Sequence, residues 1–183
     1  MSAISVLVTG GTGFLGSAIV DSLQEQHPEW SVAVLDLRDP VHTRSNVEYR
    51  IADVTSLVDI RSVIDEIRPD IIIHTAGLIP GLSSRYGRKS LERVFEVNVE
   101  GTRNMLSVAK EYGTKAFVWT SSVCCVTDDM RYQYANIDET WPTSSHSLIY
   151  GESKVMLYIY PYPSMKVLIA PGGSGMPRTN GLG

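Results

Sequence analysis

The turn at residues 9–16 limits the possible folds of this chain more than any other segment. It reads Thr-Gly-Gly-Thr-Gly-Phe-Leu-Gly, so that glycines recur at positions 10, 13 and 16. A short apolar run, Ile4 to Thr9, precedes the turn, and a pattern with apolar residues at helical spacing follows it. This order predicts a strand, a tight turn and a helix whose N-terminus presents free N–H groups to a phosphate.

Each glycine has its own physical role in this interpretation. Gly10 permits the tight turn out of the strand, Gly13 lets a pyrophosphate approach the backbone, and Gly16 lets the helix pack close to the sheet. A plain glycine-rich loop is the alternative, and the flanking strand and helix favour nucleotide binding over it. A kinase-type phosphate loop is disfavoured, because no Gly-Lys-Ser/Thr sequence follows.

The rest of the chain alternates between apolar runs and helical patterns. The clearest runs, residues 31–35, 70–74 and 115–120, are continuous rather than alternating in polarity, which suits strands buried on both faces of a parallel sheet. Residues 47–51 form a weaker run, and residues 167–170 could form one more strand. Helical spacing covers residues 15–23, 57–67 and 91–109, and the second of these follows the start signal Ser56-x-x-Asp59. The order predicts an α/β fold with a doubly wound, Rossmann-type parallel sheet that binds ligands at the carboxyl ends of its strands.

Composition places the chain among soluble globular proteins. It has 183 residues, of which 43% are hydrophobic and 20% charged, with a net charge of -4. We assign residues 1–170 to an NAD(P)-binding domain and residues 171–183 to an irregular or disordered tail, which lacks apolar periodicity. The acidic balance argues against nucleic-acid partners.

Three observations predict a cytoplasmic location. No apolar run approaches the ~18 residues of a membrane span. The N-terminus lacks the basic region of a secretory signal. The adjacent Cys124 and Cys125 cannot form a disulfide framework, which fits a reducing compartment.

Two aspartates follow strands at the predicted ligand edge. Asp36 ends the second strand, where a carboxylate can accept hydrogen bonds from the adenosine ribose and would repel a 2′-phosphate. This favours NAD over NADP, although Arg38 could accommodate that phosphate, and both charges could simply be solvated. Asp53 follows the third strand and could contact adenine or, equally, cap the next turn or helix.

A second group of polar residues predicts acid–base chemistry. Tyr150 and Lys154 are four residues apart, so on a helix the phenol and the ammonium group lie side by side. A nearby cation should lower the pKa of the phenol. Ser121 and Ser122 end the 115–120 strand, where a serine can bind a substrate oxygen. The alternatives are an exposed helix face and serines that only satisfy the backbone.

No metal site is predicted. His27, His42 and His146 are scattered without metal-ligand spacing. His74 ends a strand, and we interpret it as a hydrogen-bonded structural imidazole in preference to a catalytic one.

Taken together, these motifs resemble the extended short-chain dehydrogenase/reductases. The resemblance covers residues 4–158 and is strongest to the branch of 3β-hydroxysteroid dehydrogenases and sterol-4α-carboxylate 3-dehydrogenases. The segments that carry it are TGGTGFLG, the Asp36 strand end, IHTAG at 73–77, NVEGT at 98–102, WTSS at 119–122, DETWP at 138–142 and the Tyr150–Lys154 pair.

The resemblance implies specific roles for residues. Ser122, Tyr150 and Lys154 would be catalytic, with Tyr150 as the general base or acid. Asn98 would support the site or be a buried structural amide, and Thr75 and Ala76 would line the cofactor groove or belong to the core at the strand end. The implied cofactor-binding residues are Gly10, Gly13, Phe14, Leu15, Gly16, Asp36, Asp53, Val54, Thr75, Ala76, Tyr150 and Lys154.

The implied reaction is NAD-dependent oxidation of a secondary alcohol, sterol- or terpenoid-like, to a ketone. A nucleotide-sugar epimerase or dehydratase is one alternative, because it uses the same nucleotide site and Tyr-Lys pair. A non-catalytic NAD-binding or interaction protein is the other.

The resemblance stops after Lys154. The family continues its helix, adds a strand ending in Arg-Pro and then adds a substrate-binding lobe. In this chain the helical pattern collapses at Pro161, the strand ends at Ala170-Pro171, and the substrate lobe is largely missing. We interpret the tail as a truncation, a frame change or altered splicing. The missing lobe puts turnover in doubt more than cofactor binding, and apolar faces left uncovered would favour a homo-oligomer.

Overall fold

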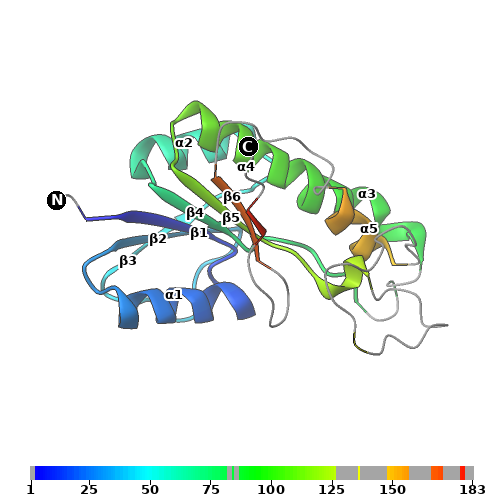
Figure 1. Ribbon diagram of the computed structural model, residues 1–183, viewed down its shortest axis with the longest axis horizontal. Helices are drawn as coiled ribbons and strands as arrows, with labels where there is room; N and C mark the ends of the chain where they lie inside the picture. Colours follow the sequence, from blue (N-terminus) through cyan, green and yellow to red (C-terminus); the bar gives the residue numbers. More distant parts are fainter. Residues whose placement is uncertain are drawn as a thin grey trace.

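The computed structural model describes residues 3–81, 84, 87–126, 136, 148–156, 166–170 and 178–179. The strands of this part form one sheet in the order β3-β2-β1-β4-β5-β6-β7 (Figure 1). All neighbours are parallel except β6 and β7. The strands are β1 (Ser5–Thr9), β2 (Ser31–Asp36), β3 (Val47–Ile51), β4 (Ile71–His74), β5 (Ala116–Thr120), β6 (Lys166–Ala170) and β7 (Arg178–Thr179). The predicted doubly wound, Rossmann-type fold is confirmed.

The helices also follow the predicted patterns. They are α1 (Phe14–Gln26), α2 (Leu57–Ile67), α3 (Leu91–Phe95), α4 (Gly101–Glu111) and α5 (Ile149–Val155), with short 3₁₀ turns η2 (Arg88–Ser90) and η4 (Val123–Cys125). At the start of α2, the Ser56 hydroxyl accepts the Asp59 N–H at 3.3 Å, as its start signal predicted. The predicted 91–109 helix contains a π-helical turn, η3 (Glu96–Glu100), between α3 and α4.

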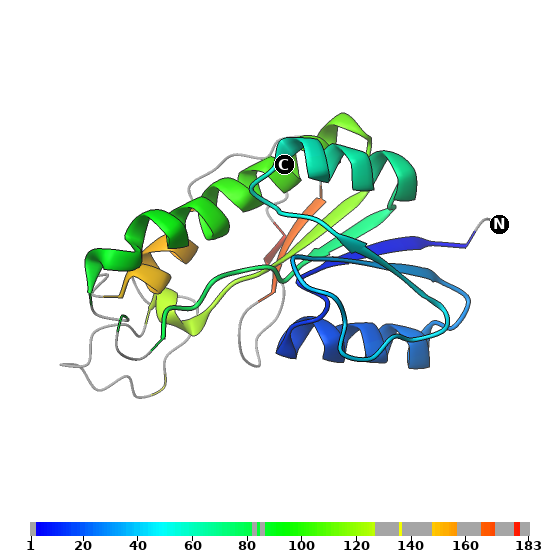
Figure 2. The same ribbon diagram turned by 180° about the vertical axis from the view of Figure 1, so that it is seen from behind.

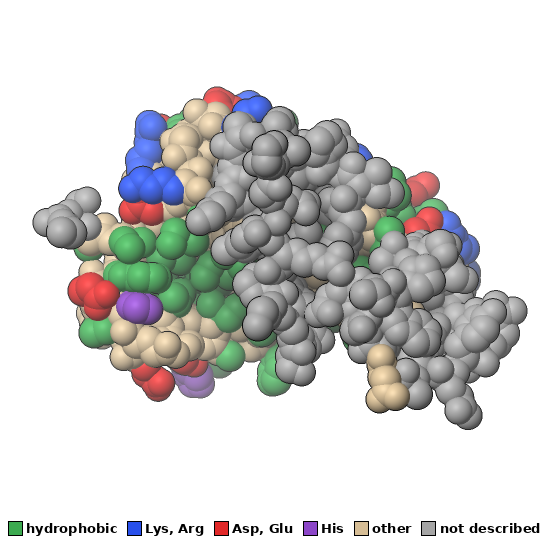
Figure 3. Space-filling view, in the orientation of Figure 1, with side chains coloured by type: hydrophobic (Ala, Val, Ile, Leu, Met, Phe, Trp, Pro, Cys, Tyr) green, Lys and Arg blue, Asp and Glu red, His purple; other side chains and the backbone are tan. Residues whose placement is uncertain are grey.

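The helices lie in two layers. Figures 1 and 2 show α1 on one side of the sheet and α2 and α4 on the other. On the α2–α4 side, Ile72 and Phe117 are fully buried in the larger core cluster. On the α1 side, Ile71 and Ile73 are only half-buried and pack against the smaller cluster. Figure 3 shows hydrophobic side chains gathered on the visible surface beside β1 and α1.

The parallel register brings residues that are distant in sequence to one edge. Thr9 pairs with His74, and His74 pairs with Trp119, so the ends of β1, β4 and β5 are aligned. The glycine turn, the exit of β4 and the two serines therefore share the carboxyl edge of the sheet, where such folds bind ligands.

The expected irregular tail is only partly described. Arg178–Thr179 forms β7 against β6, because the outer edge of β6 offers unpaired backbone groups; this differs from the expectation for these two residues. The other residues of 171–183 lie outside the described residues. Among the helices of the described part, none has the length and apolar character needed to cross a membrane.

Candidate active site

The glycine turn is held in close contact with its surroundings. Gly10 has a φ of +68°, and a Cβ there would lie 2.8 Å from the Ala76 nitrogen. A Cβ on Gly16 would lie 2.2 Å from the Gly10 carbonyl oxygen. The turn predicted at Gly10 is confirmed, and Gly16 permits α1 to pack against the turn itself. The sequence pattern gave Gly11 no role, but a Cβ there would lie 2.7 Å from the Val34 side chain.

The N-terminus of α1 is left open for an anion. Its N-cap, Gly13, provides no side-chain hydrogen bond, and the first turn holds no acidic residue. The N–H groups of Phe14, Leu15 and Gly16 have no acceptor within the helix, because they precede its first hydrogen bond, from Ser17 N–H to the Gly13 carbonyl. Phe14 is 99% exposed. These backbone donors fit a pyrophosphate, as the sequence predicted.

Asp36 connects the glycine turn to the end of β2. Its Oδ2 accepts the Thr12 N–H at 3.1 Å, and its Oδ1 accepts the Arg38 N–H at 3.2 Å. Each carboxylate oxygen keeps further acceptor capacity, so two ribose hydroxyls could still donate to it. The carboxylate is thus fixed beside the glycine turn, and its contact with a dinucleotide ribose stays a prediction.

Asp53 and Val54 make contacts that stabilise the fold. Asp53 Oδ1 accepts the Thr55 N–H at 2.8 Å, which is the turn role left open by the sequence; its contact with adenine stays a prediction. Val54 is buried in the larger core and would lie 2.9 Å from a Cβ on Gly101. The Val54 side chain packs inward because the apolar group gains by burial against the helix, and its contact with a cofactor stays a prediction.

Thr75 and Ala76 hold the exit of β4 against that of β1. The Thr75 hydroxyl donates to the Thr9 carbonyl at 2.7 Å, and the Ala76 N–H donates to Thr9 Oγ1 at 3.3 Å. Both residues lie directly beside the glycine turn, as the predicted cofactor groove requires.

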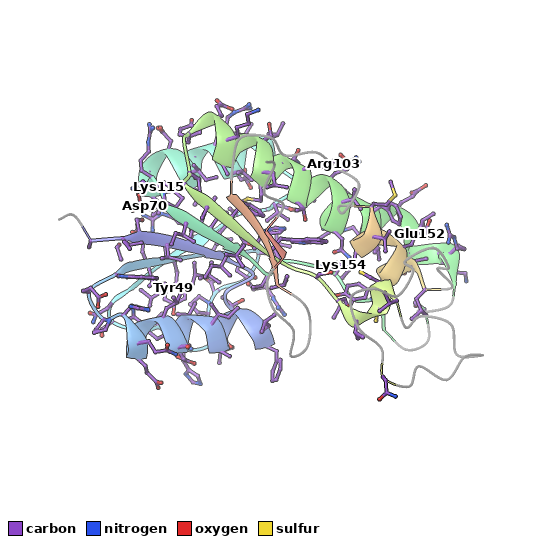
Figure 4. All side chains as sticks on the ribbon, in the orientation of Figure 1. Tyr49, Asp70, Arg103, Lys115, Glu152 and Lys154 are labelled. Carbon is purple, nitrogen blue, oxygen red and sulfur yellow. The ribbon has the colours of Figure 1, made fainter. Side chains whose placement is uncertain are left out.

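Ser122, the N-cap of η4, comes together with Tyr150 and Lys154, which both lie on α5. Ser122 caps η4 by accepting the Cys124 N–H at 3.2 Å, and its hydroxyl lies near enough to Tyr150 to lower the pKa of the phenol. Ser121 is buried, and its hydroxyl lies 3.6 Å from Cys125 Sγ. The binding of a substrate oxygen by Ser122 stays a prediction. The Lys154 ammonium lies 5.7 Å from the centre of the Tyr150 ring. In Figure 4, Lys154 lies on the side of α5 facing the strand ends and Glu152 on its outer side.

Burial dominates the acid–base properties of this group. Burial raises the pKa of Tyr150, and the nearby Ser122 hydroxyl offsets part of the rise. Burial lowers the pKa of Lys154 to about 8. The expectation that Lys154 would lower the pKa of the phenol is therefore not met by the chain alone, because its nitrogen faces the ring and desolvation acts more strongly.

A chain of buried hydrogen bonds supports the reactive helix. His74 Nδ1 lies 2.7 Å from Thr9 Oγ1, and His74 Nε2 lies 2.9 Å from Thr102 Oγ1. The Thr102 hydroxyl donates to the Asn98 carbonyl at 2.7 Å. Asn98 Nδ2 then donates to Ser153 Oγ at 3.0 Å, and Ser153 donates to the Tyr150 carbonyl at 2.7 Å. This hydrogen-bond chain connects β1, β4, η3 and α5.

The hydroxyl groups fix the proton on His74. Thr102 has one hydroxyl hydrogen and uses it on Asn98, so it must accept from the imidazole at Nε2. The other nitrogen, Nδ1, then accepts from Thr9. Burial, with a smaller effect of the Lys154 charge, lowers the pKa of His74 to about 3, so the ring stays neutral. The structural interpretation of His74 is confirmed.

Asn98 also braces the exit of β4. Its Oδ1 accepts the Leu78 N–H at 2.6 Å, and its Nδ2 donates to the Leu78 carbonyl at 3.0 Å. Asn98 thus supports the site, as the sequence suggested. Sequence reasoning missed Thr102 and Ser153 as its partners; the available signal was a polar residue within an otherwise apolar helical stripe.

Comparisons with known proteins agree with this geometry. Residues 7–157 match the 3-beta hydroxysteroid dehydrogenase/isomerase family. The sterol-4-alpha-carboxylate 3-dehydrogenase (decarboxylating) of Candida albicans is 33% identical over 163 residues, which are 82% of this chain and 43% of that protein. A 3-beta-hydroxysteroid dehydrogenase of Mycolicibacterium neoaurum is 33% identical over 154 residues, covering 82% of this chain and 40% of the relative. The chain therefore spans less than half the length of these relatives.

Solved structures show the same fold. UDP-glucose 4-epimerase of Thermus thermophilus, in complex with NAD, aligns with a TM-score of 0.75 and 28% identity over 90% of this chain and 53% of the epimerase. An epimerase of Methanothermobacter thermautotrophicus has a TM-score of 0.77 at 24% identity, over 93% of this chain and 52% of the other, and supports the fold alone. With a family match that extends from β1 through α5, the chain belongs to the 3-beta hydroxysteroid dehydrogenase/isomerase family.

Proposed function

We propose that this chain provides the NAD-binding and proton-transfer half of a dehydrogenase that oxidises a secondary alcohol, of 3β-hydroxysteroid or sterol type, to a ketone. The observation that carries the proposal is the grouping of Ser122, Tyr150 and Lys154 at the strand edge that also holds the glycine turn and Asp36. NAD is favoured over NADP because the Asp36 carboxylate would repel a 2′-phosphate. The cytoplasmic location inferred from the sequence remains part of the proposal.

The protein groups divide the work of moving one proton. Ser122 binds the substrate oxygen and directs it to Tyr150, whose phenolate takes the hydroxyl proton. Lys154 stabilises the phenolate charge and offers its remaining N–H donors to the nicotinamide ribose. When bound, NAD supplies the acceptor for the hydride that leaves the carbinol carbon.

The apolar residues that follow the site favour a sterol over a sugar. Ile79, just after Leu78, is 59% exposed, and Val123, just after Ser122, is 48% exposed. Exposed aliphatic side chains beside a hydroxyl-binding group suit a flat apolar substrate. A nucleotide-sugar epimerase remains the second candidate because of the similarity to the Thermus thermophilus enzyme.

The test starts with nucleotide binding by the parent chain. NADH and NADPH are titrated by fluorescence, and absorbance at the NADH band is then followed with 3β-hydroxysterol and UDP-sugar panels. Tighter binding of NADH and turnover of sterols are expected. Failure to bind either nucleotide would refute the proposal, and NADPH-only binding would overturn the role of Asp36. NADH binding without turnover of either panel would favour the non-catalytic alternative.

Tyr150→Phe tests the proton transfer. Loss of a general acid–base group should lower turnover by about 10² to 10⁴, whereas Tyr112→Phe, at the far end of α4, should leave it unchanged. Because burial raises the pKa of Tyr150, oxidation at saturating NAD, which needs the phenolate, should accelerate as the pH rises into the alkaline range, while NAD affinity falls as Lys154 loses its proton. A Tyr150→Phe chain as active as the parent would show that another group moves the proton.

A further inference from the structure

Lys154 carries its charge in an unusual place for a lysine. Its side chain is 3% exposed, and its ammonium donates to the Thr120 carbonyl at 3.0 Å. No carboxylate of the described ranges forms an ion pair with it. A buried ammonium without a carboxylate partner is costly unless other groups stabilise the charge.

Among the described residues, the titratable groups around the ammonium supply no fixed negative charge. His74 of β4 is neutral, and the thiol of Cys125 in η4 has a pKa raised by burial. Tyr150 of α5 likewise has a raised pKa. At neutral pH, these three neighbours are therefore uncharged and leave the stabilisation to dipoles and aromatic rings.

An aromatic ring lies where it can stabilise the Lys154 charge. The Lys154 nitrogen lies 5.2 Å from the centre of the Trp119 ring, closer than to the Tyr150 ring. A cation within ~6 Å of a ring centre is attracted by the negative face of the ring, and indole is the most effective of the three aromatic side chains. Trp119 is buried in the larger core and directly precedes Thr120, so the ring and the carbonyl acceptor are held by one strand.

We propose that Trp119 is a positioning residue for Lys154: the face of its indole holds the ammonium group beside the Thr120 carbonyl and keeps it charged within the site. The proposal concerns the chain without any ligand and does not depend on the proposed function. If that function holds, Trp119 also keeps a charged lysine ready beside Tyr150 and the ribose site.

Fluorinated tryptophan tests the ring face with little change in its shape. Trp30→Phe and Trp141→Phe together leave Trp119 as the sole tryptophan, which is then replaced by its mono-, di- and trifluoro forms. Lys154 is titrated by NMR of ¹³C-labelled lysine, with Lys154→Met to assign its signal. Each fluorine weakens the negative ring face, so the Lys154 pKa should fall stepwise, by about 0.5 units or more in total. An unchanged midpoint along the series would overturn the proposal.

Two conventional variants provide an independent comparison. Trp119→Phe keeps an aromatic face, whereas Trp119→Leu removes it, and both leave space in the core. The Lys154 pKa should be lower in Trp119→Leu than in Trp119→Phe, by about 0.5 units. Equal midpoints would assign Trp119 to packing alone and overturn the proposal.

Measuring NADH affinity against pH distinguishes a failure of this proposal from a failure of the proposed function. If the parent binds NADH, Trp119→Leu should lose affinity at a lower pH than Trp119→Phe does, because its lysine loses the proton earlier. Identical pH profiles would count against Trp119. Absence of NADH binding by the parent would refute the proposed function, and the NMR titrations would still decide the role of Trp119.

Discussion

The nucleotide end and the reactive end of the site are held in place by different kinds of groups. At the nucleotide end, backbone atoms dominate: the glycines of the turn and the N–H groups that bind Asp36. At the reactive end, buried side chains dominate: His74, Thr102, Asn98 and Ser153 donate and accept in one connected series. The first end therefore depends on the absence of side chains, and the second on the presence of specific ones.

This difference determines how substitutions should destabilise each end of the site. Adding a methyl group at Gly10 or Gly16 creates a clash with backbone atoms, which no rotamer change can relieve. Removing a hydroxyl from the hydrogen-bond chain leaves the space intact but leaves buried donors and acceptors without partners. Substitutions at the two ends should thus separate steric from polar causes.

The largest effect is expected for Gly16→Ala. Helix propensity alone would favour alanine by about 1 kcal/mol, but its Cβ would lie 2.2 Å from the Gly10 carbonyl oxygen and 2.7 Å from the Gly11 Cα. We expect the clash to outweigh propensity, with a loss of about 3 kcal/mol in the free energy of unfolding, the upper part of the usual overpacking range. NADH affinity should fall by more than about tenfold. Urea denaturation and fluorescence titration measure both effects.

Gly81→Ala is the matched control, because a Cβ there meets nothing within 4 Å. It should change the free energy of unfolding by less than about 0.5 kcal/mol, as surface substitutions generally do. If Gly16→Ala were as stable as Gly81→Ala, the contact between α1 and the turn would have to be looser than the structure shows.

The nucleotide end was predictable because its signals are local. The turn, its flanking strand and helix, and Asp36 lie within one continuous stretch of sequence, and each glycine carries its own steric reason. Helix starts such as Ser56-x-x-Asp59 are local in the same sense. Val54 shows the limit of this reasoning: no local signal predicts that Gly101, far along the chain, receives its side chain in the core.

The reactive end was predictable only in its residue types. The sequence could group Ser122, Tyr150 and Lys154, but the sign of the pKa shift of Tyr150 depends on burial, which requires the packed structure. The hydrogen bonds of His74 depend on the register that aligns β1, β4 and β5. A π turn at Asn98, which aims its amide at both Leu78 and Ser153, has no comparable local signal.

The second prediction concerns the buried charge at the reactive end. The folded chain holds Lys154 with a pKa of about 8 instead of 10.5, so between these pH values the unfolded chain binds more protons. Stability should therefore rise with pH in this window, by up to about 3 kcal/mol relative to a chain that lacks the lysine. Lys154→Met, of similar length and without charge, should abolish this rise.

Urea denaturation of both chains at pH 7.5, 9 and 10.5 measures that difference. Comparing the two chains at each pH cancels the opposing contributions of Tyr150 and Cys125, whose raised pKa values destabilise the fold at alkaline pH. Parallel curves for the parent and Lys154→Met would mean that the ammonium is better solvated than its burial implies.

The smallest of the three effects is expected at Thr102, in the middle of the hydrogen-bond chain. Thr102→Val keeps the shape of the side chain, but it leaves the His74 Nε2–H without an acceptor and removes the donor to the Asn98 carbonyl. We expect a loss of about 1 to 3 kcal/mol in the free energy of unfolding, the usual cost of a buried unsatisfied group. Thr102→Ser keeps the hydroxyl and loses one methyl, so it should cost less, about 1 kcal/mol. Denaturation of both variants gives the difference.

An exposed contact of α5, the helix at the end of the hydrogen-bond chain, shows why burial should decide the size of this effect. Arg88 pairs with Glu152 of α5 at 2.8 Å, but its side chain is 59% exposed, so Arg88→Ala should cost less than about 0.5 kcal/mol. NMR of the His74 nitrogens adds a measurement independent of stability: the proton should stay on Nε2 in the parent and in Thr102→Ser and lose that preference in Thr102→Val. If Thr102→Val matched Thr102→Ser in both measurements, the hydroxyl would not support the imidazole, and the reactive end would depend on packing, as the nucleotide end does.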